Sequence, residues 1–210
     1  MATTIFLLRH AAHDRVDRVL CGRMPGVRLG APGHAQASAL AAKLDREAIV
    51  CVYSSPLERC METAAAIATR LGVPLRSTSQ AVEIDFGDWT GRDFAELEGR
   101  ADWQAWNGGR DTAQAPGGES MTDVRQRMLA LLEALRQRHD GERIALVSHG
   151  DVIKAALGHT LGLPLQAYGR FDIDPASLSP LALWQGGGKV LRMNELPAMA
   201  GGTPEHGDAP

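Results

Sequence analysis

Short apolar runs alternate along the chain with longer segments in which apolar residues recur at helical spacing. The runs at 5–8, 49–53 and 144–147 are almost entirely apolar, as in strands buried on both faces of a sheet. In the segments 124–135 and 152–161, the apolar residues would share one face of a helix. This alternation predicts an α/β fold, a three-layer α/β/α sandwich with a mostly parallel central sheet.

Capping residues mark two of the expected helices. Ser55 suits the N-cap of a helix, Glu58 completes a capping box with it, and Gly72 should end that helix. Ser120 and Asp123 form a second capping-box pattern. Both helices are therefore expected to begin at these serines.

The remaining segments are less clearly patterned. Residues 36–44 are expected to lie in an alanine-rich helix whose cap position, Gly30, is weak. Strands are expected at 171–173 and 178–184, with 190–193 as a hairpin partner. The stretch 90–118 has poor periodicity and several glycines. We interpret it as a helical insertion that covers one side of a site.

The composition bounds the size and the partners of the molecule. With 210 residues and 44% hydrophobic content, the chain suffices for one domain, expected at 1–196. Residues 197–210 are rich in Gly, Pro and small residues, which predicts a disordered C-terminal tail. Because the net charge is -3, no basic face indicates nucleic acid as a partner.

The cysteines and the start of the chain favour a cytoplasmic protein. Cys21, Cys51 and Cys60 include no CxxC pair, and an odd number is a poor disulfide framework. Reduced thiols are expected in the cytoplasm. The apolar run 5–8 is too short for a signal peptide, and no apolar stretch is long enough for a membrane span.

Five polar side chains stand where strand-like runs meet loops or helices, and together they suggest phosphoryl transfer. Arg9 and His10 end the first apolar run, His149 ends a late one, Arg59 follows a third, and Glu83 lies in a loop. Ligands of parallel α/β sheets gather at the carboxyl ends of strands. Arginines can grip a phosphate bidentately, a neutral imidazole can attack phosphorus, and a carboxyl can protonate a leaving oxygen. Each residue alone has an ordinary structural explanation, whereas the joint pattern predicts a phosphoryl-transfer site.

These residues stand in sequence blocks that resemble the histidine phosphatase superfamily, the clan that also holds the cofactor-dependent phosphoglycerate mutases. The resemblance covers about 5–183, with the blocks in family order and spacing. The blocks are Leu8-Arg-His-Ala11, Ser54-Ser-Pro-Leu-Glu-Arg-Cys-Met-Glu-Thr-Ala64, Glu83-Ile-Asp-Phe-Gly-Asp-Trp-Thr-Gly91, Pro116-Gly-Gly-Glu-Ser120 and Val147-Ser-His-Gly150.

The resemblance implies a role for each of the five residues. His10 is the expected nucleophile, which becomes phosphohistidine. Arg9, Arg59 and His149 are expected to hold the phosphoryl oxygens through the transition state. Glu83 is the expected proton donor to the leaving alcohol, and later helps to activate water. Neither a metal nor another cofactor is implied, because arginine and imidazole supply the charge that a metal would give.

Three positions depart from the family pattern. Ala11 replaces the usual glycine, which would cost about 1 kcal/mol if this residue needed a positive φ. His13 stands where many members have Ser or Thr, and Val16 where many have an asparagine that touches the phosphate. His13, Arg15, Arg18 and Arg23 are candidates to compensate for the lost phosphate contacts. We expect His13 and Arg23 to bind the substrate, and the alternative for Arg23 is a solvated loop arginine.

Other phosphate-binding motifs fail on detail. Cys51 is followed by an arginine only at Arg59, too far for the loop of cysteine phosphatases. Asp172-Ile-Asp-Pro-Ala176 lacks the Thr or Val of an aspartate-nucleophile motif. Gly186-Gly-Gly-Lys-Val190 lacks P-loop spacing and is better explained as part of a hairpin.

Three functions remain, and hydrolysis is the preferred one. The mutases of the family carry a longer, basic insertion after the glutamate block, whereas 92–116 is short and carries five acidic residues. We therefore expect a metal-independent phosphatase that hydrolyses a small phosphorylated metabolite. The alternatives are phosphoglycerate mutase-type transfer and a non-catalytic module that binds a phospholigand. The natural substrate and the oligomeric state stay open, and dimers occur in the family.

Overall fold

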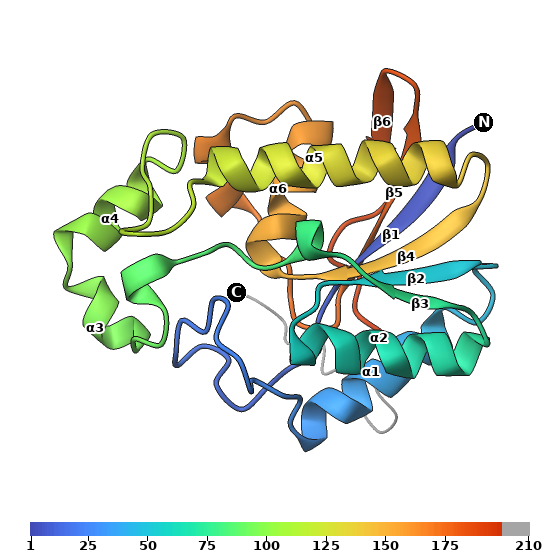
Figure 1. Cartoon of the computed structure of the whole chain (residues 1–210), viewed down its shortest axis with the longest axis horizontal. Coiled ribbons are helices and arrows are strands. Elements are labelled where there is room, and N and C mark those ends of the chain that lie inside the picture. The colour runs from blue at the N-terminus through green and yellow to red at the C-terminus, as the bar shows by residue number, and fades with distance from the viewer. Residues whose placement is uncertain (199–210) are drawn as a thin grey trace, which may run out of the picture.

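The computed structural model describes residues 1–198. It is a three-layer arrangement in which helices cover both faces of a central sheet (Figure 1). The tail predicted from residue 197 onward lies outside the described residues except for its first two positions.

The sheet has six strands in the order β3-β2-β4-β1-β5-β6. The first four in this order run parallel, while β5 and β6 form an antiparallel hairpin at one edge. The strands are β1 (Thr3–Arg9), β2 (Cys51–Ser54), β3 (Leu75–Ser77), β4 (Arg143–Ser148), β5 (Leu178–Trp184) and β6 (Gly187–Val190). The register pairs Arg9 with Ser148 and Ser54 with Val147, so β1, β2 and β4 end at the same edge.

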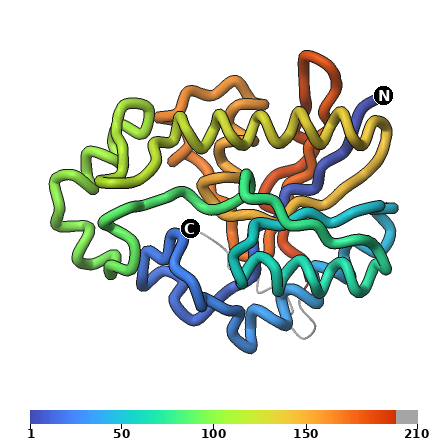
Figure 2. The backbone as a smooth tube through the Cα atoms, in the orientation of Figure 1, coloured from blue at the N-terminus to red at the C-terminus, as the bar shows by residue number. Residues whose placement is uncertain are grey.

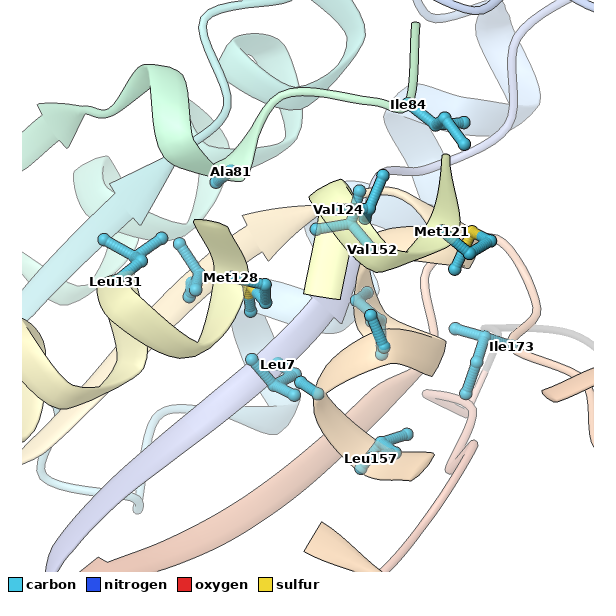
Figure 3. Close-up of a cluster of buried hydrophobic side chains, with 14 of the residues drawn as sticks. Leu7, Ala81, Ile84, Met121, Val124, Met128, Leu131, Val152, Leu157 and Ile173 are labelled. Carbon is cyan, nitrogen blue, oxygen red and sulfur yellow. The ribbon is translucent and has the colours of Figure 1, made fainter. Parts of the chain in front are cut away.

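Side chains of β1 alternate between two hydrophobic cores, one on each face of the sheet. Ile5 and Leu7 pack against α5 (Met121–Arg138) and α6 (Gly150–Thr160), as Figure 3 shows for Leu7. Phe6 and Leu8 point to the other face, which α1 (Ala31–Lys43) and α2 (Glu58–Leu71) cover. Because all four side chains are fully buried, the apolar run that predicted this strand is explained by burial on both faces.

The predicted helical insertion lies to one side of the sandwich (Figure 2). It contains α3 (Phe94–Glu98) and α4 (Ala101–Gly108), preceded by the short 3-10 helices η1 (Ser79–Ala81) and η2 (Gly87–Trp89). Trp89 and Trp106 are buried and meet edge to face, with ring centroids 6.0 Å apart. This aromatic contact fixes the insertion to the loop that carries Glu83.

Several of the expected elements are confirmed. The strand at 178–184 and its hairpin are present, and Ser120 and Asp123 form the predicted capping box. Gly72 ends α2 in the left-handed conformation with a φ of 65°.

Two expectations are wrong and one strand was not expected. Residues 171–173 form no strand; they follow the 3-10 helix η3 (Leu165–Arg170), and Asp172 and Ile173 line a cleft instead. The hairpin partner is Gly187–Val190 rather than 190–193, because the turn after Trp184 is tight. The unexpected strand β3 is a three-residue edge strand whose side chains are mostly exposed.

The capping role assigned to Ser55 is also wrong. Helix α2 begins at Glu58 after the N-cap Leu57, and no side chain caps it. Ser55 is fully buried and its hydroxyl lies 2.8 Å from Nε2 of His149. Glu58 accepts a hydrogen bond from the Gly26 backbone N–H instead of closing a capping box.

Within residues 1–198, none of the helices is both long and apolar enough to cross a membrane.

Candidate active site

The five predicted residues come together at the edge where β1, β2 and β4 end. Arg9 ends β1 and His10 follows it, His149 follows β4, and Arg59 lies in the first turn of α2. A cleft of about 410 Å³ opens at this edge, and Arg9, His10, Arg59 and Glu83 line it. His149 is fully buried beside it, with its ring centroid 5.2 Å from that of His10.

The His10 ring is held in one tautomer. Its Nδ1 lies 2.9 Å from the Ala11 carbonyl oxygen, which can only accept, so Nδ1 carries the proton. The lone pair of Nε2 faces Arg59, whose Nε donates to it at 3.3 Å. Burial, followed by the charges of Arg59 and Arg9, holds the pKa of His10 well below its ordinary value. The ring is therefore a neutral imidazole at neutral pH, with Nε2 as its nucleophilic atom.

The two arginines leave buried N–H groups without a partner. Arg59 Nη2 donates to the Gly22 carbonyl at 2.8 Å, while its Nη1 is buried with no hydrogen-bond partner among the described residues. Arg9 Nη1 donates to the Ile173 carbonyl, and its buried Nε is equally without a partner there. Buried cationic donors rarely remain unpaired. These groups point to an anion that binds beside Nε2 of His10.

His149 is positioned by contacts on both ring nitrogens. Nε2 lies 2.8 Å from Ser55 Oγ, and Nδ1 lies 3.2 Å from Arg59 Nη2 and 3.7 Å from Glu83 Oε2. Burial and then Arg59 hold the pKa of His149 well below its ordinary value. Sequence reasoning missed Ser55 as a partner of this ring, because its neighbours have the pattern of a helix cap.

A buried cysteine lies behind His149. Cys60 Sγ is 3.4 Å from Nε2 of His149 and is completely buried. Burial raises the pKa of the Cys60 thiol to about 12. The thiol is therefore protonated near neutral pH and is no competing nucleophile, since the thiolate is the reactive form.

Hydrogen bonds to its backbone carbonyl hold Glu83 in place, and the pKa of its carboxyl group is raised. Its carbonyl oxygen accepts from Arg23 Nε at 2.8 Å and from Arg127 Nη2 at 3.2 Å, and its carboxylate accepts from the Ile84 N–H at 2.9 Å. Burial, and next the negative charge of Asp151, raise the pKa of Glu83 to about 7 against the opposing effect of Arg59. A carboxyl group with this pKa can donate a proton near neutral pH.

Asp151 is a cleft residue near Glu83 that sequence reasoning missed. It lies in the first turn of α6, lines the cleft, and accepts a hydrogen bond from Arg110 Nη1 of the insertion at 2.6 Å. The signal in the sequence was its place two residues after His149, at a helix start that faces the site. Asp151 therefore links the insertion to the acidity of Glu83.

Replacing Asp151 with asparagine is expected to move the pH profile of phosphorylation. Removal of the negative charge lowers the pKa of Glu83, so Glu83 loses its proton at lower pH and the alkaline limb of the rate shifts downward in pH. The measurement is the single-turnover rate of phosphoenzyme formation with an alkyl phosphate as a function of pH. The matched control is Asp88→Asn, which removes an exposed carboxylate from the loop that carries Glu83. An alkaline limb at the same pH in Asp151→Asn and wild type would contradict this coupling.

Arg23, predicted to bind substrate, does not line the cleft. Its Nε donates to the Glu83 carbonyl, and its two terminal nitrogens lie 3.4 Å from Asp85 and 2.8 Å from Glu119. All three nitrogens are thus engaged in holding the Glu83 loop. That Arg23 binds substrate therefore stays a prediction; in this structure its side chain is 34% exposed and contacts the Glu83 loop.

The three departures from the family pattern lie at or near the cleft, and Val16 is among the residues that line it. His13 lines it and stacks on His10, with ring centroids 5.5 Å apart. Burial, and then Arg59 and Arg9, lower the pKa of His13 to about 4, so the ring is neutral at neutral pH. Ala11 does not have a positive φ, so no strain arises from the missing glycine, and its N–H donates to Thr63 Oγ1 at 3.0 Å.

No three His, Cys, Asp or Glu side chains in the described part of the chain are grouped so as to hold a metal ion.

Comparison with known proteins identifies the family. Residues 5–196 match the model of the histidine phosphatase superfamily (branch 1), and the chain belongs to this family. The resemblance drawn from the sequence blocks is thereby confirmed, as is the fold class.

Relatives cover nearly the whole chain. Phosphoserine phosphatase 1 of Hydrogenobacter thermophilus is 31% identical over 195 residues, which are 90% of this chain and 91% of that protein. The probable phosphoglycerate mutase GpmB of Escherichia coli is 31% identical over 214 residues, 98% of this chain and 95% of that protein. The solved structure of YhfR from Bacillus stearothermophilus has a TM-score of 0.87 at 25% identity, with 93% of this chain and 98% of that one covered.

Proposed function

We propose that this protein is a metal-independent phosphatase that hydrolyses a small phosphate monoester through a phosphohistidine at His10. The observation that carries the proposal is the neutral Nε2 of His10, which lies beside buried guanidinium N–H groups that have no hydrogen-bond partner within residues 1–198. This arrangement places a nucleophile next to an anion-binding site. The relative named phosphoserine phosphatase 1 supports the same class of reaction.

The reaction then has two displacements at phosphorus. In the first, Nε2 of His10 forms a bond to phosphorus while the bond to the ester oxygen breaks, and Glu83 gives its proton to the leaving alcohol. Arg9, Arg59 and His149 hold the phosphoryl oxygens. In the second, a water molecule attacks phosphorus, Glu83 takes its proton, and the N–P bond breaks to free phosphate and restore neutral His10.

Mutase-type transfer is the alternative, and the relative named as a probable phosphoglycerate mutase favours it. The charges of the cleft favour hydrolysis. Beyond the arginines, the cleft is lined by four aspartates and a single lysine. A mutase must retain a small acidic intermediate and return the phosphoryl group to it, and these aspartates would repel such an intermediate. The four aspartates are Asp17, Asp151, Asp172 and Asp174, and the lysine is Lys154.

Hydrolysis is expected to exceed isomerisation in a direct assay. The protein is incubated with 3-phosphoglycerate and a bisphosphoglycerate primer, and in parallel with p-nitrophenyl phosphate, in EDTA. We expect release of inorganic phosphate from at least one ester, inhibition by vanadate and no loss of activity in EDTA, because arginine and imidazole carry the charge. Rapid exchange between 2- and 3-phosphoglycerate with little phosphate release would establish the mutase instead. Loss of activity in EDTA that a divalent ion restores would refute the mechanism.

The remaining expectations stay predictions. We propose a single catalytic domain over 1–196. We also propose a cytoplasmic location, which is supported by the three free, buried cysteines. A homodimer and the lack of a nucleic-acid partner are expectations from the sequence alone.

A further inference from the structure

Lys154 is the cation of the cleft that the proposed phosphate site does not use. Arg9 and Arg59 surround Nε2 of His10, whereas Lys154 lines the cleft from the second turn of α6. Gly150 at the start of this helix lies against the guanidinium of Arg9. Lys154 follows four residues later on the same helix face, about 5.4 Å along the axis, and helical side chains lean back toward the N-terminus. Its ammonium group therefore belongs to the part of the cleft that adjoins the phosphate site.

The Lys154 side chain is largely buried but only weakly paired. It is 15% exposed, and its Nζ lies 3.6 Å from Oδ1 of Asp172, whose side chain is 87% exposed. The same Nζ lies 5.8 Å from the centre of the Phe171 ring. An ion pair with so exposed a carboxylate contributes little. An anionic group on a bound substrate can therefore replace Asp172 as the partner of Lys154.

The carboxylates near Lys154 would oppose a substrate that carries only negative charge. Asp151 is paired with Arg110 at 2.6 Å, and Asp174 accepts from the Asn194 amide at 2.8 Å. Asp172, once displaced from Lys154, and Asp17 are the cleft carboxylates with neither another ion pair nor a side-chain hydrogen bond among the described residues. An ammonium group on the substrate would complement these two carboxylates.

We propose that Lys154 binds a carboxylate on the alcohol part of the substrate, and that the aspartates select an alcohol that also carries an ammonium group. The substrate class is then the phosphate ester of a hydroxy amino acid. This inference rests on the proposed phosphatase function and adds the recognition of the leaving group. Lys154 is then a specificity-determining residue, because its own side-chain ammonium group contacts the substrate at the carboxylate, away from the reacting atoms.

Three matched esters separate the two contacts. O-phospho-L-serine carries both groups, phosphoethanolamine lacks the carboxylate, and 3-phosphoglycerate has a hydroxyl in place of the ammonium. We expect kcat/KM for O-phospho-L-serine to exceed that for each of the others about tenfold or more, as for one charge-assisted hydrogen bond. Equal or faster hydrolysis of phosphoethanolamine would overturn the role of the carboxylate. Equal or faster hydrolysis of 3-phosphoglycerate would overturn the selection of an ammonium group.

The variant Lys154→Met tests the residue itself. It is expected to reduce the preference for O-phospho-L-serine over phosphoethanolamine about tenfold or more, through KM as well as kcat/KM, and Lys154→Arg should restore part of it. Lys189→Met, on the exposed strand β6, is the control and should keep the wild-type preference. An unchanged preference in Lys154→Met would overturn the inference. Hydrolysis of p-nitrophenyl phosphate that depends on His10 keeps this failure distinct from failure of the phosphatase function, in which no ester would be hydrolysed.

Discussion

Replacing His10 with alanine is expected to reduce the hydrolysis of every phosphate ester by several powers of ten and to abolish the phosphoenzyme. The substitution removes Nε2, the unprotonated ring nitrogen that faces Arg59 in the cleft. Because the effect is on the attacking atom, it does not depend on the leaving group. The measurement is steady-state hydrolysis of an alkyl and an aryl phosphate, together with an alkaline quench of the protein after mixing with substrate, which preserves a phosphohistidine for detection.

His13→Ala is the matched control for this experiment. His13 is a second neutral imidazole in the same cleft, stacked on His10. Its removal should leave an acid-labile phosphoenzyme that still forms, although substrate binding weakens. A phosphoenzyme that persists in His10→Ala and disappears in His13→Ala would mean that His13 is the nucleophile.

Glu83→Gln is expected to slow the phosphorylation step in proportion to how much the leaving group needs a proton. General acid catalysis contributes about 10²–10⁴-fold where the leaving group is poor. An alkyl phosphate should lose close to that full factor. A nitrophenolate leaves readily without a proton, so p-nitrophenyl phosphate should lose much less.

The comparison has to be made on phosphoenzyme formation in a single turnover, because Glu83 also acts as a base in the second step. Asp85→Asn is the matched control, since this carboxylate lies two residues away and is engaged with the Gly87 N–H and Arg23. Equal losses for both esters in Glu83→Gln would mean that Glu83 is not the leaving-group acid. Asp151, which lines the cleft, would then be the next candidate.

The sequence predicted most of the layers because their signals are local or periodic. The apolar run 5–8 became a strand buried on both faces, and the Ser120 capping box was found as expected. The convergence of Arg9, His10, Arg59 and His149 followed from the rule that ligands gather where parallel strands end, whereas Glu83 was assigned by the family resemblance. Such rules need only the order of elements along the chain.

The misses have a common physical cause, which is that tertiary contacts replaced a local pattern. Ser55 has the neighbours of a helix cap, yet a buried histidine takes its hydroxyl. Arg23 was expected to contact the substrate, but its three nitrogens contact two carboxylates and the Glu83 carbonyl. Asp151 gains its importance from an arginine 41 residues away. None of these partners can be deduced from spacing.

The central claim is that phosphate is carried on Nε2 of His10, and direct observation of the phosphoenzyme tests it best. The protein is mixed with a slowly dephosphorylated ester and quenched in alkali, where phosphohistidine survives. The site is then located by peptide mass spectrometry, and the nitrogen is assigned by phosphorus NMR. We predict a transient phosphoryl group on Nε2 of His10, formed at the rate at which the alcohol is released. Phosphate on another residue or on Nδ1, or alcohol release with no phosphoenzyme at any time, would contradict the mechanism.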